Sequence, residues 1–287
     1  MAISTIEFSK KDAKTLSPKT LRKIRLGMRR DGVIAFSSLF PRPLLKRVRR
    51  EVLRRHDTGE LRERGLIRNI AGRYAAVLPF DGAFLRPEFY ANSRVLEIIA
   101  SLLGSNHCIG SLEVVVAMPG SYEQHQHIDG PLRFDRTIGK KKLAFQGDLS
   151  DLPPYAVGLA VPLCAVDENN GPTAIWPGSH RTALLPRPPG EAKVRRDYPV
   201  EYMTADFGSA YLFDYRTFHG GMPNHTPEPR PLLMMVFTRS WFRDPNLDEV
   251  FPSVVISKRN LNRIPDRYRY LFMLAPTARR EIWAKKS

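Results

Sequence analysis

The sequence of 287 residues contains only two cysteines, Cys108 and Cys164. Two cysteines without nearby ligand partners exclude a disulfide framework and a structural zinc site, and they favour reduced thiols in the cytoplasm. Long apolar runs are also absent, since no stretch approaches the roughly 20 residues that a membrane span requires. The first residues lack the apolar segment of a signal peptide, so we expect neither a secretory leader nor a membrane span.

Positive charge, in contrast, is abundant and unevenly distributed. The formal net charge is +16, with 20 Lys and Arg against 7 Asp and Glu in residues 1–75, and 9 against 2 in residues 258–287. Basic clusters attract phosphates and other anions, but they also decorate solvated helix faces. Nothing resembles the basic strand with interleaved aromatic residues that binds nucleic acid. Nucleic acid is therefore an alternative partner that we do not expect.

Helix signals concentrate in the first hundred residues. Ser17 and Pro18 begin an amphipathic segment that Gly32 ends, residues 41–56 form a second, and residues 92–104 form a third. A short strand is predicted between the first two, in residues 33–40. The segment 68–84 is expected to be a loop that shapes a pocket, since loops on a rigid core often carry specificity.

From residue 106 onward, short β-rich runs alternate with Gly and Pro turns. This pattern predicts an all-β sandwich or barrel. The weakly periodic segment 130–154 is a candidate lid. We expect one domain over residues 1–287, with a helical part to about residue 105, a β-core over 106–243 and a C-terminal extension over 244–287. The predicted strands lie in the runs 108–118, 155–164, 172–178, 209–215 and 230–242.

Residues 123–130 carry the most suggestive cluster of polar side chains, in the stretch EQHQHIDG. In a strand, residues two apart point to the same side, so His127 and Asp129 would share a face, with His125 behind them. A His and a carboxylate are two of the three ligands in the facial triad of non-haem Fe(II) sites. Taken alone, this short pattern also fits a polar loop that binds nothing.

A second candidate segment contains His219 and Arg230. His219 ends a β-rich run and precedes Gly220 and Gly221, which would let the backbone turn sharply beside a ligand. Arg230 opens the next apolar run and would share a face with apolar residues. Burying an inward-facing arginine costs free energy unless it meets a carboxylate. Its planar guanidinium can donate two parallel hydrogen bonds to one carboxylate. A strand-start arginine facing solvent is the alternative.

Together these motifs resemble the phytanoyl-CoA dioxygenase family. The resemblance rests on His127-x-Asp129, the stretch NNGPTAIWPGSH (169–180), His219 with Asn224, and Arg230. It implies a mainly β fold with flanking helices around a double-stranded β-helix (jelly-roll, cupin-like) core. It also implies an Fe(II)- and 2-oxoglutarate-dependent oxygenase that uses O2.

Carried over to this sequence, the resemblance makes His127, Asp129 and His219 the iron ligands. Arg230 would bind the distal carboxylate of 2-oxoglutarate, with a hydroxyl from Thr173. Gln124 would contact the co-substrate near the metal. His125 and His225 compete as ligands, but neither has the spacing of the family pattern.

The implied reaction is hydroxylation of an unactivated C–H bond in a small or medium organic metabolite, with release of succinate and CO2. Desaturation or ring formation, a nucleic-acid-directed oxygenase and a catalytically silent ligand-binding jelly roll are the alternatives. The basic ends, with Arg73, Arg133 and Arg136, suggest an anionic substrate group. The sequence indicates neither the substrate itself nor the oligomeric state.

Overall fold

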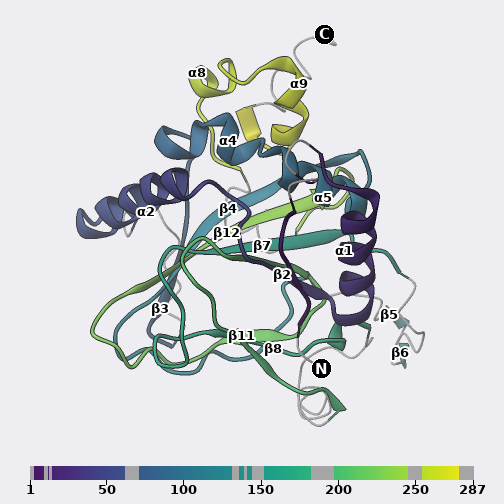
Figure 1. Ribbon diagram of the computed structural model, residues 1–287, viewed down its shortest axis with the longest axis vertical. Helices are drawn as coiled ribbons and strands as arrows, with labels where there is room; N and C mark the ends of the chain where they lie inside the picture. Colours follow the sequence, from purple (N-terminus) through teal and green to yellow (C-terminus); the bar gives the residue numbers. More distant parts are fainter. Residues whose placement is uncertain are drawn as a thin grey trace.

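The computed structural model describes residues 3–9, 12, 15–61, 71–130, 136–138, 141–143, 152–181, 197–244 and 254–277. A large sheet and a small sheet face each other, and helices cover the far side of the large sheet (Figure 1). In their order across the large sheet, the strands are β1 (Thr5–Ile6), β2 (Val33–Phe36), β10 (Ala210–Asp214), β7 (Ala156–Pro162), β12 (Arg230–Arg239), β4 (His107–Ala117) and β3 (Arg73–Val77).

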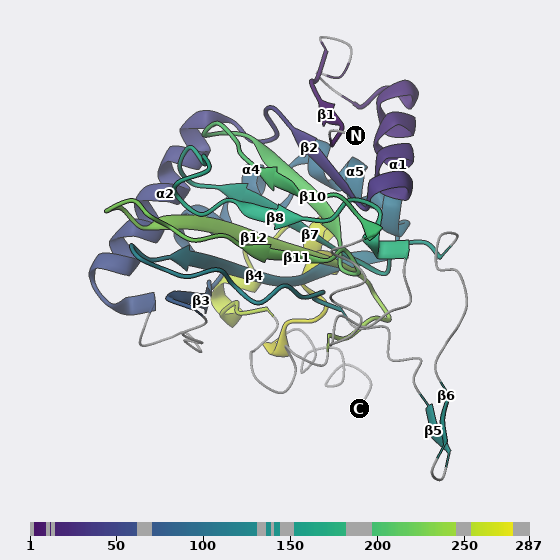
Figure 2. The same cartoon turned by 90° about the horizontal axis from the view of Figure 1, so that it is seen from below.

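The small sheet has the order β11 (His219–Gly221), β8 (Thr173–Ile175) and β9 (Glu201–Met203). All strand pairs in the two sheets are antiparallel except β1 with β2. A separate hairpin of β5 (Arg136–Ile138) and β6 (Lys141–Leu143) stands away from both sheets (Figure 2). This architecture is mainly β with flanking helices, as the sequence predicts.

The helices start and stop where capping residues predict. Ser17 Oγ accepts a hydrogen bond from Thr20 N at 3.2 Å, and Gly32 ends the first helix with a left-handed φ of 70°. The Asn92 side chain accepts from Val95 N and caps the helix Ser93–Leu103. The helices are α1 (Pro18–Asp31), α2 (Arg42–Asp57), α4 (Pro87–Tyr90), α5 (Ser93–Leu103), α8 (Lys258–Leu261) and α9 (Asp266–Arg269), with 3-10 turns η2 (Gly82–Leu85), η3 (Ser179–Arg181) and η4 (Tyr270–Phe272).

The two faces of the large sheet have different roles because side chains alternate along each strand. On β12, Leu233, Met235 and Phe237 are buried against the helices in the main hydrophobic core. Their neighbours Leu232, Met234 and Val236 point to the opposite face, where they line a cavity between the two sheets. Helix packing thus holds the sheet from one side and leaves the other side for a site.

Two segments differ from the expected loops. Residues 68–84 contain the edge strand β3 and the turn η2, so the expectation of a loop there is wrong. The segment still shapes the pocket, because Arg73 and Ala75 on β3 line the cavity. Most of the candidate lid 130–154 lies outside the described residues, and the backbone of β5 and β6 forms its described middle.

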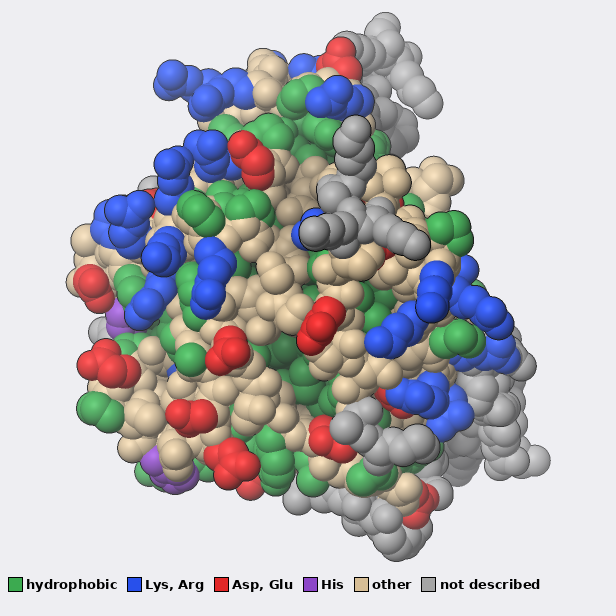
Figure 3. Space-filling model, in the orientation of Figure 1, with side chains coloured by type: hydrophobic (Ala, Val, Ile, Leu, Met, Phe, Trp, Pro, Cys, Tyr) green, Lys and Arg blue, Asp and Glu red, His purple; other side chains and the backbone are tan. Residues whose placement is uncertain are grey.

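The basic residues of the N-terminal part lie mostly on exposed helix faces. Figure 3 shows Lys and Arg side chains gathered over α2 and α1, around a hollow near the middle of this face. Arg47 and Arg50 on α2 are exposed, whereas Arg55 is buried and paired with Glu51 and Asp81. Within the described ranges, no helix combines the length and apolar character that crossing a bilayer requires.

Candidate active site

Two backbone hydrogen bonds hold His127 and His219 opposite each other. His127 N donates to His219 O at 2.8 Å, and His219 N donates to His127 O at 2.9 Å. The bridge joins the first residue of β11 to a loop that is otherwise not paired as a strand. His127 was expected in a strand and His219 at the end of one. Both expectations are wrong in this detail, yet the bridge brings the two imidazoles together, with ring centroids 4.6 Å apart.

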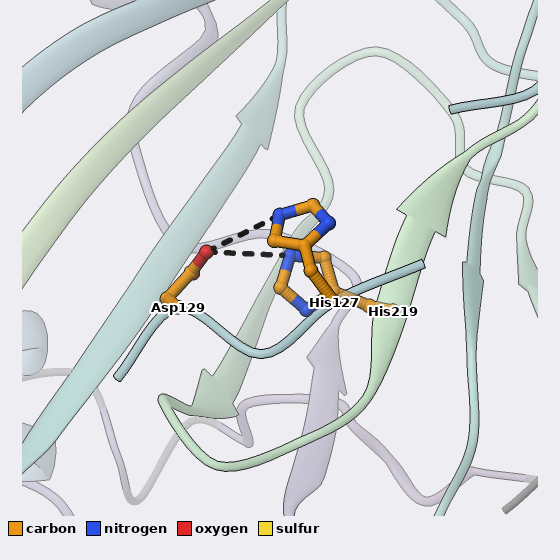
Figure 4. A group of neighbouring side chains, drawn as sticks. All are labelled: His127, Asp129 and His219. Carbon is orange, nitrogen blue, oxygen red and sulfur yellow. Dashed lines mark ion pairs between the residues drawn. The ribbon is translucent and has the colours of Figure 1, made fainter. Parts of the chain in front are cut away.

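Asp129 completes the cluster from the same loop. Its Oδ1 lies 3.5 Å from His127 Nε2 and 3.7 Å from His219 Nε2 (Figure 4). The carbonyl of Tyr215, just after β10, accepts hydrogen bonds from the backbone N–H groups of Asp129 and Gly130, both at 3.1 Å. The ligand-type atoms of the three side chains all lie within 4.8 Å of one another. One loop and one strand end therefore present the three groups to a single point.

The hydrogen bonds of the two imidazoles fit a metal site. His127 Nδ1 lies 2.9 Å from the carbonyl of His125, and His219 Nδ1 lies 3.0 Å from the carbonyl of Thr217. Since a carbonyl can only accept, each Nδ1 carries the proton and each Nε2 keeps its lone pair. Both Nε2 atoms face Asp129. Two neutral imidazoles and one carboxylate form the donor set that non-haem Fe(II) takes, and the residues present fit this ion.

Burial and mutual charge shift the pKa values of all three groups. Burial lowers the pKa of His219, and this outweighs the opposing effect of Asp129. Burial also acts against the charged form of His127, but the Asp129 carboxylate outweighs it and raises the pKa of His127. For Asp129, burial alone would raise the pKa, but the two imidazoles lower it by a larger amount, so the net effect is a lowered pKa. The carboxylate therefore stays ionised beside His219, which stays neutral.

A cavity of about 430 Å³ lies beside the three side chains, and Arg230 reaches into it from the start of β12. Arg230 is 3% exposed, and its Nη2 donates to the Gly171 carbonyl at 2.6 Å. Its Nε is buried and has no hydrogen-bond partner within the described structure. Burial accordingly lowers the pKa of Arg230. The inward orientation predicted for Arg230 is confirmed, and the orphaned Nε fits an anionic ligand such as the 2-oxoglutarate carboxylate.

Arg73, which was named only as a possible contact for an anionic substrate group, is a second buried arginine. It is 2% exposed, and its guanidinium donates to the carbonyls of Tyr122 and Met222. Burial lowers the pKa of Arg73 to about 10, and the charge of Arg230 adds to the effect. Surface exposure was the ordinary expectation for Arg73. The strand β3 instead turns it into the cavity, opposite the small sheet.

Thr173 and Gln124 also line the cavity. Thr173 Oγ1 lies 2.7 Å from the hydroxyl of Tyr211, which couples the small sheet to the large one. Gln124 Oε1 accepts from the Gly221 N–H at 3.0 Å, so its carbonyl oxygen holds β11 in place. Both side chains therefore border the space that a ligand held by Arg230 and the three metal-binding groups would occupy.

The glycines after His219 serve close approach rather than a turn. Gly220 and Gly221 belong to β11, which contradicts the sharp turn predicted there. A Cβ at Gly221 would lie 2.8 Å from Arg73 Nε, and one at Gly220 would lie 3.1 Å from the side chain of Gln126. A side chain at Gly221 would therefore displace the buried guanidinium of Arg73.

The competing histidines do not join the cluster. His125 is exposed, although it borders the cavity. His225 is exposed in the turn after β11, and its backbone N–H donates to the Asn169 carbonyl. His180 is buried in the turn η3 and lies 3.2 Å from the carbonyl of Arg29, as a structural turn residue would.

Residues 28–232 match the model of the family described as Phytanoyl-CoA dioxygenase (PhyH). The chain belongs to this family. The predicted family and its class of chemistry, a non-haem iron and 2-oxoglutarate dioxygenase, are therefore confirmed. The nucleic-acid-directed alternative receives no support from the proteins that the chain resembles.

Two solved structures share the fold. The first, EctD from S. alaskensis with 2-oxoglutarate and 5-hydroxyectoine, is 20% identical with a TM-score of 0.60, covering 81% of this chain and 78% of that one. The second, the non-heme alpha ketoglutarate dependent carbocyclase SnoK from nogalamycin biosynthesis, is 17% identical with a TM-score of 0.56, covering 86% and 96%. These likenesses confirm the predicted jelly-roll core.

A curated relative is similar over a shorter stretch. An ectoine dioxygenase from Nocardia farcinica (strain IFM 10152) is 30% identical over an alignment of 105 residues, and the match covers 29% of this chain and 35% of the relative. The match thus spans about a third of that protein. It agrees with the family, but the substrate of the relative does not follow for this chain.

Proposed function

We propose that this protein oxidises an unactivated C–H bond of a small or medium organic metabolite, using Fe(II), 2-oxoglutarate and O2, with release of succinate and CO2. One observation carries the proposal. Two Nε2 lone pairs and one carboxylate converge beside a cavity that also contains the buried, partly orphaned guanidinium of Arg230. A catalytically silent jelly roll has no use for that combination.

In this proposal, His127, Asp129 and His219 hold the iron from one side. Iron and 2-oxoglutarate, when bound, would supply the oxidising chemistry with O2. The protein would orient the substrate and exclude water from the site. Arg230 pairs with the distal carboxylate of 2-oxoglutarate, and the hydroxyl of Thr173 points to the same group. Gln124, fixed by Gly221, borders the co-substrate near the metal.

Hydroxylation is the outcome that we favour. Asp129 keeps a carboxylate at the ligand position, and related halogenating enzymes have a small residue there. Desaturation or ring formation remains the alternative, because a carbocyclase has the same fold. The substrate's chemistry decides between these outcomes.

The proposed setting is the cytoplasm, where reducing conditions suit the free thiols of Cys108 and Cys164. The proposed partner is a small molecule. The anionic group suggested by the basic ends stays a prediction. Within the described structure, the cations that line the cavity are Arg73 and Arg230, and we assign Arg230 to the co-substrate.

The test is an anaerobic titration with Fe(II) and 2-oxoglutarate. We expect a weak visible absorbance band from the ketone bound to iron, and we expect Asp129→Ala and His219→Ala to abolish it. The matched control is His225→Ala, which changes an exposed histidine outside the cavity and should leave the band unchanged. A folded wild-type protein without the band, or an unchanged band in Asp129→Ala, would overturn the assignment.

A further inference from the structure

The cavity has a basic end that the sheet register defines. Arg73 on β3 and Arg230 on β12 both pair with Ala117 of β4, one from each side. The two guanidinium groups therefore start from the same level of the sheet. All three strands face the small sheet at this level. The proposed 2-oxoglutarate carboxylate belongs to this end.

Glu113 marks the other end. It lies four residues before Ala117 on the same strand and the same face, which places its Cα about 13 Å away at the usual rise per residue. It pairs with Val77 of β3 and Met234 of β12. Like Arg73 and Arg230, it lines the cavity. Glu113 and the two guanidinium groups therefore start from different levels of one cavity wall, and Glu113 borders the part of the cavity away from the Arg230 anchor.

Among the described residues around Glu113, none carries a lysine or arginine side chain into the cavity at this end. Its neighbours on the cavity wall are Ala75, Val115, Met234 and Val236. No lysine is among the described residues that line the cavity, and both lining arginines are at the basic end. Glu113 takes part in none of the salt bridges found within the described parts of the chain.

Further negative charge lies near Glu113. Asp244, beyond the end of β12, lines the same cavity and is 8% exposed. Tyr215 hydrogen-bonds with Asp244, and Asp129, Asp244 and Glu113 all raise the pKa of Tyr215 after the larger effect of burial. A metal bound by Asp129 would take up the charge of that carboxylate, whereas Glu113 lies on the cavity wall outside the ligand cluster.

A carboxylate in an apolar wall is costly unless a cation or several hydrogen bonds accompany it. Burial is the largest cause that raises the pKa of Glu113, to about 7; a hydrogen bond with Ser111 opposes it, and the charges of Asp129 and Asp244 add to it. A ligand that brings a positive charge would remove this cost on binding. A ligand with a carboxylate would increase it.

We propose that the Glu113 end of the cavity binds a positively charged nitrogen of the substrate, such as a protonated amine. The substrate class is then an organic cation, in place of the anionic compound that the basic termini suggest. Glu113 is the specificity-determining residue, and Asp244 with Tyr215 frames the same end. This inference rests on the proposed function, because the metal and co-substrate define which end is free.

The test compares three probes with one carbon skeleton, n-butylammonium, n-butanol and n-butyrate. Each is titrated into the anaerobic protein loaded with Fe(II) and 2-oxoglutarate, and the change in the visible absorbance band gives the affinity. We expect n-butylammonium to bind at least about tenfold more tightly than n-butanol, and n-butyrate to bind most weakly. The comparison in wild-type protein needs no variant to fold.

Glu113→Gln removes the charge at nearly constant shape. We expect it to abolish the preference for n-butylammonium over n-butanol while the affinity for 2-oxoglutarate stays within about twofold. The matched control is Glu88→Gln, whose side chain is 55% exposed on α4, away from the cavity. This control should keep the preference.

Three results would overturn the inference: tighter binding of n-butyrate, no binding of n-butylammonium, or an unchanged preference in Glu113→Gln. In each of these cases the absorbance band of the loaded protein stays intact, so the proposed function survives. If the band itself never forms, the proposed function has failed instead. The two failures are therefore distinguishable in one experiment.

Discussion

The two faces of the large sheet are built from the same strands but differ in chemistry. On β12, Met235 faces the helices and is 1% exposed, whereas its neighbour Met234 lines the cavity. On β4, Leu112 and Val114 pack into the core on either side of Glu113, which faces the cavity. Alternation along a strand thus separates residues that stabilise the fold from residues that serve the site, at a spacing of one position.

This difference also concerns energy. The helix-facing side gains from burying apolar surface, whereas the cavity-facing side carries Arg73, Arg230 and Glu113 at a cost in stability. The free energy gained by burying apolar side chains on the helix-facing side offsets the cost of these buried charges. The comparison can be tested by changing one face at a time.

The largest expected effect is on co-substrate binding. Arg230→Ala should weaken 2-oxoglutarate binding by about 100-fold or more, because it removes a buried, charge-assisted contact. Titration of the anaerobic absorbance band with 2-oxoglutarate measures the change. Arg230→Lys keeps the charge but not the fork and should give an intermediate loss. An unchanged affinity in Arg230→Ala would contradict the role of this face as the anion site.

The second prediction compares equal substitutions on the two faces. Met235→Ala should lower the free energy of unfolding by about 2–5 kcal/mol, because it leaves a cavity in the packed core. Met234→Ala should cost less stability, since its side chain already borders a cavity, and should mainly change substrate-stimulated succinate release. Chemical denaturation measures the first effect and a turnover assay the second. Equal stability losses would remove the distinction between the faces.

The third prediction is a pH dependence carried by Glu113. Its pKa is about 7 in the folded protein and near 4.5 when unfolded. Between these values the folded state binds more protons, so stability falls as pH rises from about 4.5 to 7. Glu113→Gln should therefore raise the stability of the metal-free protein at pH 8 by up to about 3 kcal/mol and have little effect at pH 4. Thermal unfolding at both pH values tests this, and a destabilised variant at pH 8 would contradict it.

The smallest effect is expected on the surface of α2. Replacing both Arg47 and Arg50 by Gln should change stability by less than about 0.5 kcal/mol and leave 2-oxoglutarate binding unchanged. Gel shifts at physiological salt should show no binding of single-stranded or double-stranded nucleic acid by either form. If the wild-type protein bound nucleic acid tightly and the double variant did not, the basic surface of α2 would be a nucleic-acid-binding site.

The sequence predicted the elements with strong local signals. Capping residues located α1 and α5, and apolar runs located β4, β7 and β12 close to their observed bounds. Weak local signals explain the omissions. The stretch RYAAV of β3 combines an arginine with small residues, and β11 consists of a histidine and two glycines. Neither favours a strand until its neighbours pair with it.

The site shows the same division. His127, Asp129, His219 and Arg230 were identified from their pattern, and the structure brings them to one cavity. Arg73 was named as a possible contact for an anionic group, but its burial was not predicted, because its carbonyl partners lie 49 and 149 residues away in the chain. The position of Glu113 opposite those arginines depends on the register of three strands, which no local pattern gives.

Asn224 has a consequence for how this site can change. Its buried side chain donates to the Ala117 carbonyl at 3.0 Å and to the Glu228 carbonyl at 2.9 Å, which closes the turn between β11 and β12. The Asn224 Oδ1 atom also accepts from the Thr226 hydroxyl at 2.7 Å, so the sheet and the tip of the turn meet on one side chain. Loss of Asn224 would release both at once, which makes this single amide the clasp of the chain between His219 and Arg230.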